Sequence, residues 1–332
     1  MKILCTFDYE IFFGNNTGTA ERSIIKPTYL LLQLAEKHKI KLVFFVDSGY
    51  LLKLEQYKDK YPKLKDDYDK IVNQLKCISK EGHDIQLHVH PHWEDSFYNG
   101  IKWNINSKRY KLHDFSENEI NDIIKRYKNA LTRMSGNDIN AIRAGGWCIQ
   151  PFSKLSKSLK CNNIYYDSTV FEGGYNKSTT HYYNFKNVPQ KSIWQFEDDP
   201  LIEVTNGRFT EIPISSYFVG PRFYWQYALT KVIKIKHFQM YGDGEGIDAS
   251  NAYKFRLLTK KTNSVVSLDG IKTLFLQDAF DHYRKLFPNG YFNIIGHPKG
   301  LTPYSLAKFD LFLSANRGYY KTTTINNIIK NK

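Results

Sequence analysis

The chain has 332 residues, a formal net charge of +14 and 15% aromatic residues. Hydrophobic residues make up 42% and charged residues 24%, which is ordinary globular usage and allows a sizeable core. No apolar run approaches the roughly 18 residues of a transmembrane helix, and no RNA- or DNA-binding motif accompanies the charge. The charge therefore predicts either a solvated basic surface or attraction to an anionic partner, such as a phosphorylated substrate or a membrane surface. The tightest basic run spans residues 231–237.

The cysteines and the N-terminus indicate the compartment. The four cysteines, Cys5, Cys77, Cys148 and Cys161, are widely spaced and match no CxxC metal motif. The first residues, MKILCTFDYEIFFG, lack the long apolar stretch of a signal peptide. We therefore expect a cytoplasmic protein with reduced thiols.

Strand-like and helix-like segments alternate along the chain. Seven β-type runs lie at 2–10, 40–47, 83–90, 140–146, 163–169, 208–215 and 291–297. Helical patterns lie between most of them, at 26–39, 116–134 and 270–287, and the second opens with the capping-box pair Ser116 and Glu119. This alternation predicts parallel βαβ units in an α/β fold, as a distorted (β/α)7 barrel or an open sheet.

The region 172–262 differs from the rest because it is long, loop-like and aromatic. We expect it to be an elaborated loop region within a single domain spanning 1–332, with a helical piece at 217–238. Its aromatic residues 217–228 are candidates for a sugar platform, but they would serve equally well in a core-facing helix.

Polar residues follow five of the predicted strands at the point where each strand ends. They are Asp8, Glu10, His88, His90, His92, Arg143, Asp167 and His297. Because chemistry in a parallel barrel collects at the carboxyl ends of the strands, these side chains predict one active site.

The carboxylates and histidines have the composition of a catalytic metal site. Asp8 and Glu10 are two residues apart on a strand and therefore face the same way. Alternation in the third run (83–90) pairs His88 with His90, whereas a turn at Pro91, which follows His90, would bring His92 back to His88. Both pairs stay open on physical grounds. A mixed carboxylate and histidine set leaves positions for water and substrate, as catalytic Zn²⁺ sites do.

Five segments resemble, in order, the motifs of the polysaccharide deacetylases of carbohydrate esterase family 4. These are TFDYE (6–10), HVHPH (88–92), RAGGW (143–147), YYDST (165–169) and IIGHP (294–298). The resemblance covers most of the chain and implies a distorted (β/α) barrel of about seven strands, in agreement with the run count.

The resemblance also implies roles for the residues. His88 and His92 would bind a divalent metal, most simply Zn²⁺, which leaves His90 as a neighbour of the site. Asp8 would be the general base and His297 the general acid. Arg143 would hold and tune the catalytic Asp8, and Asp167 would help to orient His297.

The first motif departs from the family pattern, because Tyr9 stands where a metal-binding aspartate is usual. We expect Glu10 to be the ligand instead and Tyr9 to be a neighbour that supports the metal ligands, although Asp8 as ligand and Glu10 as base stays open. Trp93 and Trp147 lie in or beside the second and third motifs and are candidate substrate contacts.

The implied activity is metal-dependent removal of an N-acetyl or other acyl group from an aminosugar. The substrate would be nucleotide-linked or lipid-linked, in O-antigen or capsule synthesis, with peripheral membrane association as one use of the basic charge. The alternatives are a deformylase or cyclic-amide hydrolase on the same barrel, or a catalytically degraded member that binds glycan.

Overall fold

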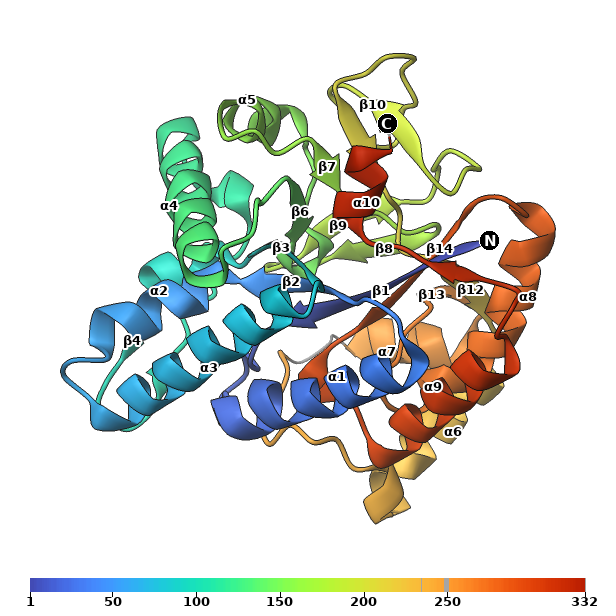
Figure 1. Cartoon of the computed structure of the whole chain (residues 1–332), viewed down its shortest axis with the longest axis horizontal. Helices are drawn as coiled ribbons and strands as arrows, with labels where there is room; N and C mark the ends of the chain where they lie inside the picture. Colours follow the sequence, from blue (N-terminus) through green and yellow to red (C-terminus); the bar gives the residue numbers. More distant parts are fainter. Residues whose placement is uncertain (234, 248–250, 332) are drawn as a thin grey trace.

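The computed structural model describes residues 1–233, 235–247 and 251–331, and it contains one large, mostly parallel sheet (Figure 1). The order of the strands is β10-β11-β7-β6-β3-β2-β1-β14, and β15 pairs with β1. The strands are β1 (Lys2–Tyr9), β2 (Val43–Asp47), β3 (Asp84–Val89), β6 (Ala141–Ala144), β7 (Tyr166–Asp167), β10 (Trp194–Phe196), β11 (Phe209–Glu211), β14 (Tyr291–Gly296) and β15 (Lys321–Thr322). Only the pairing of β10 with β11 is antiparallel among these described strands.

The sheet curls into a distorted barrel, so the predicted fold class is confirmed. Each of the seven predicted runs contains one of the strands β1, β2, β3, β6, β7, β11 and β14. The backbone N–H of Ser215, just after β11, donates to the carbonyl of Asn293 in β14 over 2.9 Å. This contact links the β11 side of the sheet to β14 without a regular ladder.

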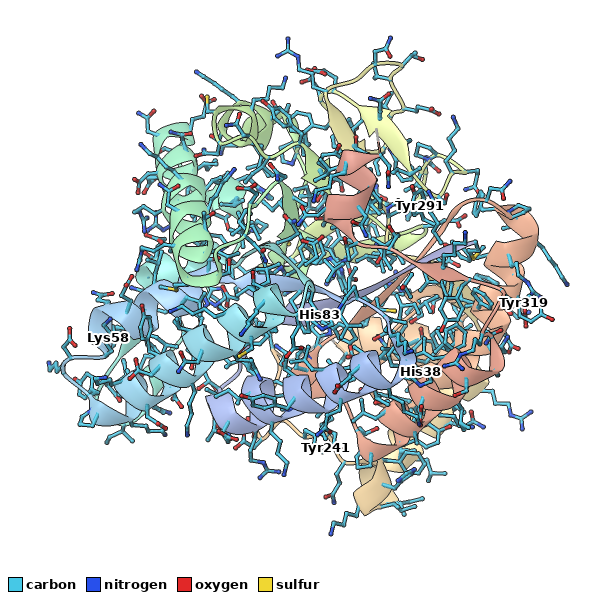
Figure 2. All side chains as sticks on the ribbon, viewed as in Figure 1. His38, Lys58, His83, Tyr241, Tyr291 and Tyr319 are labelled. Atoms are coloured by element: carbon cyan, nitrogen blue, oxygen red, sulfur yellow. The ribbon has the colours of Figure 1, made fainter. Side chains whose placement is uncertain are left out.

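Helices pack around the outside of the sheet (Figure 1). They are α1 (Lys26–His38), α2 (Ser48–Tyr57), α3 (Pro62–Lys80), α4 (Glu117–Ser135), α5 (Ser153–Cys161), α6 (Pro221–Ile233), α7 (Asn251–Thr259), α8 (Leu276–Leu286), α9 (Pro303–Ala315) and α10 (Ile325–Lys330). The predicted capping box of α4 is present, because Ser116 Oγ accepts from the Glu119 N–H. His38 lies 2.6 Å from Asp310 and joins α1 to α9 (Figure 2). Within the described residues, no helix is both long and apolar enough to cross a bilayer.

The predicted loop region 172–262 contains more regular structure than the sequence indicated. It holds the hairpin of β8 (Gly174–Lys177) and β9 (Tyr182–Phe185), and the strand β12 (Ser216–Val219), which pairs with β13 (Thr262–Val265). The predicted helical piece 217–238 is therefore wrong at its start, since Pro221 begins α6. Residues 234 and 248–250 lie outside the described residues. A further hairpin joins β4 (Phe97–Tyr98) and β5 (Trp103–Asn104).

The barrel interior changes from apolar to polar along the strand direction. Near the amino ends of the strands, Leu4, Val43 and Phe45 pack with Ile325 and Ile328 of α10, which closes that end. Further along the same strands the inward positions become polar, and this polar end carries the candidate site.

Candidate active site

The two carboxylates of β1 face the barrel interior together. Asp8 and Glu10 are both buried, at the carboxyl end of β1. Tyr9 points to the opposite face, where its hydroxyl donates to Gln74 Oε1 over 2.8 Å. The expectation that Tyr9 supports the metal ligands is therefore corrected, because strand alternation directs its side chain away from them, into the layer between the sheet and the helices.

Glu10, His88 and His90 form one compact group. Glu10 Oε2 lies 3.0 Å from His88 Nε2 and 2.6 Å from His90 Nε2, and the two ring nitrogens are 3.1 Å apart. One ligand atom from each residue lies within 4.8 Å of the others. His88 Nδ1–H donates to the Arg143 carbonyl over 2.8 Å, which fixes the ring and directs Nε2 toward Glu10.

The structure does not bring His92 into this group. Pro91 begins a short 3-10 helix (Pro91–Asp95), and that turn carries His92 sideways, so it does not return to His88. Its ring stacks on Tyr110, with centroids 5.4 Å apart, and contacts Phe13 at 4.7 Å. Both of its ring nitrogens are buried without a hydrogen-bond partner among the described residues. The structure therefore groups His90, and not His92, with Glu10 and His88, as strand alternation predicts, and which of the two histidines binds the metal stays a prediction.

Close packing explains the glycine of the RAGGW segment. A Cβ on Gly145 would lie 2.5 Å from the His90 ring, so the backbone after β6 forms a wall of the site. A larger residue there would push His90 away from Glu10.

The electrostatics of the group fit a cation. Burial alone would lower the pKa of His88, but Asp8 and Glu10 outweigh burial and raise it to about 9. Burial lowers the pKa of His90 to about 4. Burial would raise the pKa of Glu10, yet Lys299 and His90 hold it well below its ordinary value. An ionised carboxylate and an uncharged imidazole thus face a position where positive charge is favoured, which is the donor set that a divalent metal takes.

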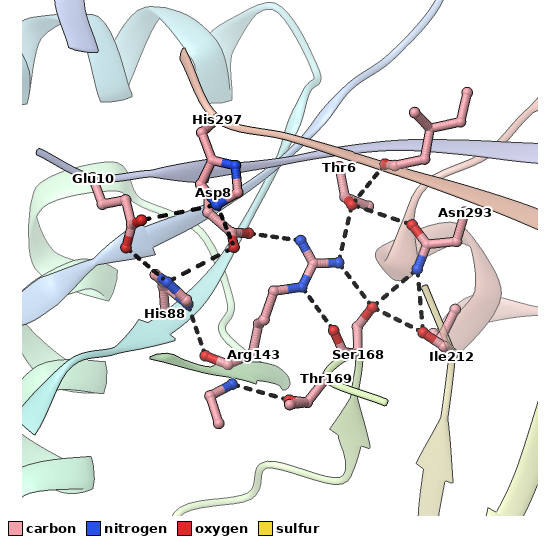
Figure 3. Close-up of polar contacts among 12 residues, drawn as sticks. Thr6, Asp8, Glu10, His88, Arg143, Ser168, Thr169, Ile212, Asn293 and His297 are labelled. Atoms are coloured by element: carbon pink, nitrogen blue, oxygen red, sulfur yellow. Dashed lines mark hydrogen bonds and ion pairs between the residues drawn. The ribbon is translucent and has the colours of Figure 1, made fainter. Parts of the chain in front are cut away.

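A buried arginine network holds Asp8 in place (Figure 3). Arg143 Nη1 donates to Asp8 Oδ1 over 2.6 Å, and Arg143 Nη2 donates to both Thr6 Oγ1 and Ser168 Oγ at 3.0 Å. The guanidinium also lies over the Phe45 ring, 4.1 Å from its centroid. Because Oδ1 is held, Asp8 Oδ2 faces the histidines, 3.8 Å from His88 Nε2.

His297 lies beside Asp8 and is oriented by an aspartate that the sequence analysis missed. Its Nε2 is 3.5 Å from Asp8 Oδ2, and its Nδ1 donates to Asp269 Oδ2 over 2.8 Å. The backbone N–H of His297 donates to the other oxygen of Asp269, also at 2.8 Å. Burial would lower the pKa of His297, but Asp269 and Asp8 outweigh it and raise that pKa.

Asp167 does not orient His297, so that expected role is corrected. Within the described part of the chain, no Asp167 oxygen lies within 4.0 Å of a His297 nitrogen. Asp167 instead accepts a hydrogen bond from Thr169 and faces Glu211 in the paired strand β11. The signal for Asp269 was present in the sequence, because SVVSLDG (264–270) is another apolar run that ends in an acid.

Lys299 is a second residue that sequence reasoning missed. Its Nζ donates to Glu10 Oε1 over 2.8 Å and to the Ile11 carbonyl over 2.6 Å. The lysine therefore holds one oxygen of Glu10 and leaves Oε2 toward His88 and His90.

The two candidate tryptophans have different environments. Trp93 is fully buried and donates to Asp47 Oδ2 over 2.7 Å, so it is a core residue and the expected substrate contact is corrected. Trp147 is half-buried and lines a cavity of about 480 Å³ beside the site. Its position allows the predicted contact with substrate, which stays a prediction.

No protein-family model matches the chain, and no curated protein matches it either. Several solved structures do. A protein assigned as a polysaccharide deacetylase from Mycobacterium smegmatis aligns with a TM-score of 0.52 at 14% identity, over 99% of this chain and 89% of that one. The chain therefore has the polysaccharide deacetylase fold. A protein of the same assignment from Pseudomonas aeruginosa PAO1 gives 0.51 at 11% identity, and Puue allantoinase gives 0.52 at 11%, both with the same coverage.

Proposed function

We propose that this chain is a metal-dependent hydrolase that removes an N-acetyl or other acyl group from an aminosugar. The observation that carries the proposal is the pairing of a carboxylate, Asp8, with an imidazole, His297, directly beside the Glu10–His88–His90 group. A binding protein has no need for a base, a buried arginine that holds it and an oriented acid. The fold shared with polysaccharide deacetylases supports the same reaction class.

The residues divide the reaction between them. Glu10, His88 and His90 would hold the divalent ion, with Zn²⁺ the best match to a mixed nitrogen and oxygen set. When bound, that ion would polarise the acyl carbonyl and lower the pKa of water.

Proton transfer falls to the two groups beside it. Asp8 Oδ2 would accept the proton from the attacking water, because Oδ1 is occupied by Arg143. His297 Nε2–H would donate to the nitrogen as the amide bond breaks, while Asp269 keeps Nδ1 occupied.

The substrate is proposed to be an aminosugar carried on a nucleotide or lipid, used in surface-polysaccharide synthesis in the cytoplasm. The net charge of +14 supports an anionic carrier. We also propose that the protein associates peripherally with anionic membranes through α6. Trp225, Leu229, Val232 and Ile233 are exposed on this helix, with Arg222 exposed at its start and Lys236 just after it.

The test is hydrolysis by the purified full chain loaded with Zn²⁺, with acetate and formate release measured on N-acetyl and N-formyl aminosugars and ring opening measured on allantoin. Acetate release that is lost in Asp8→Asn supports the proposal. Formate release alone would instead indicate a deformylase, and allantoin opening alone would indicate a cyclic-amide hydrolase. Metal binding without any hydrolysis would favour a degraded member.

A further inference from the structure

Two joined cavities extend away from the candidate active site. The first, called here the aromatic cavity, has a volume of about 480 Å³ and is lined by Trp147, Phe223, Tyr227 and Lys272 among others. It approaches the site at Trp147, two residues after the Gly145 that packs against the His90 ring.

The second, called here the basic pocket, has a volume of about 270 Å³ and continues from the first. The two share the lining residues Phe171, Tyr183, Tyr253, Leu257 and Asn263. A ligand that fills both would reach from Trp147, on the side of the site, into the basic pocket.

Four cations line the basic pocket, and no acidic residue does so among the described residues. They are Lys186, Arg256, Lys260 and Lys261. In the described chain, none of the four has a carboxylate oxygen within 4.0 Å, although other lysines and arginines have such partners. Arg256 is partly buried and the three lysines are exposed, so the pocket presents unpaired positive charge that would attract an anion.

Arg256 is held in a fixed position within this pocket. Its guanidinium carbon lies 5.1 Å from the Tyr253 ring centroid, and Nη2 donates to the Tyr175 carbonyl over 3.3 Å. Its Nε is buried without a hydrogen-bond partner among the described residues. Lys186 lies over the other ring, 4.4 Å from the Tyr175 centroid. The pocket thus presents an oriented arginine with an unused donor, which is the geometry that phosphate recognition uses.

We propose that the basic pocket binds the phosphate or diphosphate of the substrate, and that the aromatic cavity spans the distance between this group and the sugar amide. The inference rests on the proposed function for the identity of the reacting sugar, and on the pocket alone for the anion. The ligand class is a sugar with a phosphate-linked carrier, and a nucleoside diphosphate and a lipid diphosphate share this chemistry.

Binding is tested first without catalysis, by calorimetric titration of the metal-loaded chain with inorganic pyrophosphate. Arg256→Gln and Lys260→Glu should each weaken binding about tenfold or more, because each removes a charged hydrogen-bond partner. Lys157→Met is the matched control, since Lys157 is an exposed helical lysine with no carboxylate within 4.0 Å among the described residues. His88→Ala identifies pyrophosphate bound at the metal, because that fraction would disappear with the metal. Binding that depends on His88 and not on Arg256 would overturn the inference.

Kinetics then tests the substrate class. We compare kcat/KM for a phosphate-linked sugar, either UDP-N-acetylglucosamine or its prenyl-diphosphate counterpart, with kcat/KM for free N-acetylglucosamine. Arg256→Gln should lower the ratio of the first value to the second by about tenfold. The carrier for which the ratio falls identifies the source of the phosphate. Equal effects on all three sugars would contradict a phosphate subsite. Pyrophosphate binding that needs Arg256, in a protein that hydrolyses no amide, would keep the subsite and refute the proposed function.

Discussion

His90 and His92 lie two residues apart, yet only His90 faces Glu10. Strand geometry controls His90, because β3 continues far enough to direct it to the same side as His88. Aromatic packing controls His92, whose ring lies between Tyr110 and Phe13. The two histidines are therefore predicted to differ sharply in their effect on the metal.

We predict that His90→Ala lowers metal affinity by more than about a hundredfold, since loss of a ligand exceeds the usual effect of losing a supporting residue. His92→Phe keeps an aromatic ring in the same packing and should keep the metal. Metal content by mass spectrometry after dialysis checks both variants. The reverse result, with metal lost in His92→Phe and kept in His90→Ala, would restore His92 as the ligand.

The pairing of His297 with Asp269 predicts a pH dependence. Asp269 raises the pKa of His297, so the protonated imidazole persists to higher pH than it would alone. In Asp269→Asn the pKa of His297 falls, and the alkaline limb of the kcat/KM profile should move to lower pH. His297→Ala should lower kcat by about 10²–10⁴-fold, the usual contribution of a general acid, with the metal retained. An unshifted alkaline limb in Asp269→Asn would assign that limb to another group.

Polar residues at the strand ends could be predicted from the sequence, and the family resemblance gave Arg143 as the partner of Asp8, but the aspartate that pairs with His297 could not be predicted. Asp8, Glu10, His88 and Arg143 all follow apolar runs and converge in the structure. Asp167 meets the same rule, yet it accepts a hydrogen bond from Thr169 and lies opposite Glu211, where the two-residue strand β7 pairs with β11. Which acid reaches His297 depends on the position of the loop after β13, which a strand pattern does not specify.

At the scale of elements, the β7–β11 pair holds two buried carboxyl groups face to face. Burial raises the pKa of Asp167 to about 6, and burial together with Asp167 raises the pKa of Glu211 well above its ordinary value. Both groups therefore bind protons more tightly in the folded chain than in the unfolded one. The contribution of Asp167 to stability is complete below about pH 4 and is lost as pH rises through about 6, and that of Glu211 is lost as pH rises through its own raised pKa.

We predict that Glu211→Gln reduces this pH dependence, because an amide donates to Asp167 at every pH. As pH rises from 5, the free energy of unfolding of the unaltered chain should fall relative to that of the variant, by about 1.4 kcal/mol for each pH unit over which Glu211 keeps its proton in the folded chain. Urea denaturation at a series of pH values measures the difference, with exposed Glu36→Gln as the control. If the free energies of unfolding of Glu211→Gln and of the unaltered chain changed in parallel with pH, the raised pKa of Glu211 would not contribute to the pH dependence.

The predicted helices and strands agree with the structure where apolar periodicity is strong. They differ from it where a glycine conformation or a distant pairing partner sets the local structure. Seven strands and the helices α1 and α4 follow their patterns closely. In 270–287, however, the structure has a 3-10 helix (Gly270–Phe275) before α8, because Gly270 adopts a left-handed φ of 53°. The antiparallel pairing of β12 with β13 joins segments about 45 residues apart, and no local pattern predicts such a partner.

At the scale of the molecule, the exposed apolar side chains are unevenly distributed. A lone exposed leucine such as Leu311 on α9 is ordinary for a protein surface. On α6, by contrast, Trp225, Leu229 and Val232 are exposed along one stripe, while Phe223 and Tyr227 of the opposite face line the aromatic cavity. The proposed membrane contact and the aromatic cavity therefore lie on opposite faces of one helix, as the proposed lipid-linked substrate would require.

This arrangement predicts binding to vesicles that contain phosphatidylglycerol, with much weaker binding to neutral phosphatidylcholine vesicles. Basic residues near a bilayer contribute about 1 kcal/mol each and are screened by salt, so binding should fall as ionic strength rises. The double variant Trp225→Glu, Leu229→Glu should lose most of the bound fraction in co-sedimentation, because it removes apolar area and adds repulsion from anionic lipid. Leu311→Glu is the matched control, since it changes an equally exposed leucine on a different face. If both variants bound equally well, α6 would not be the membrane contact, and the phosphate-linked carrier would then be met in solution.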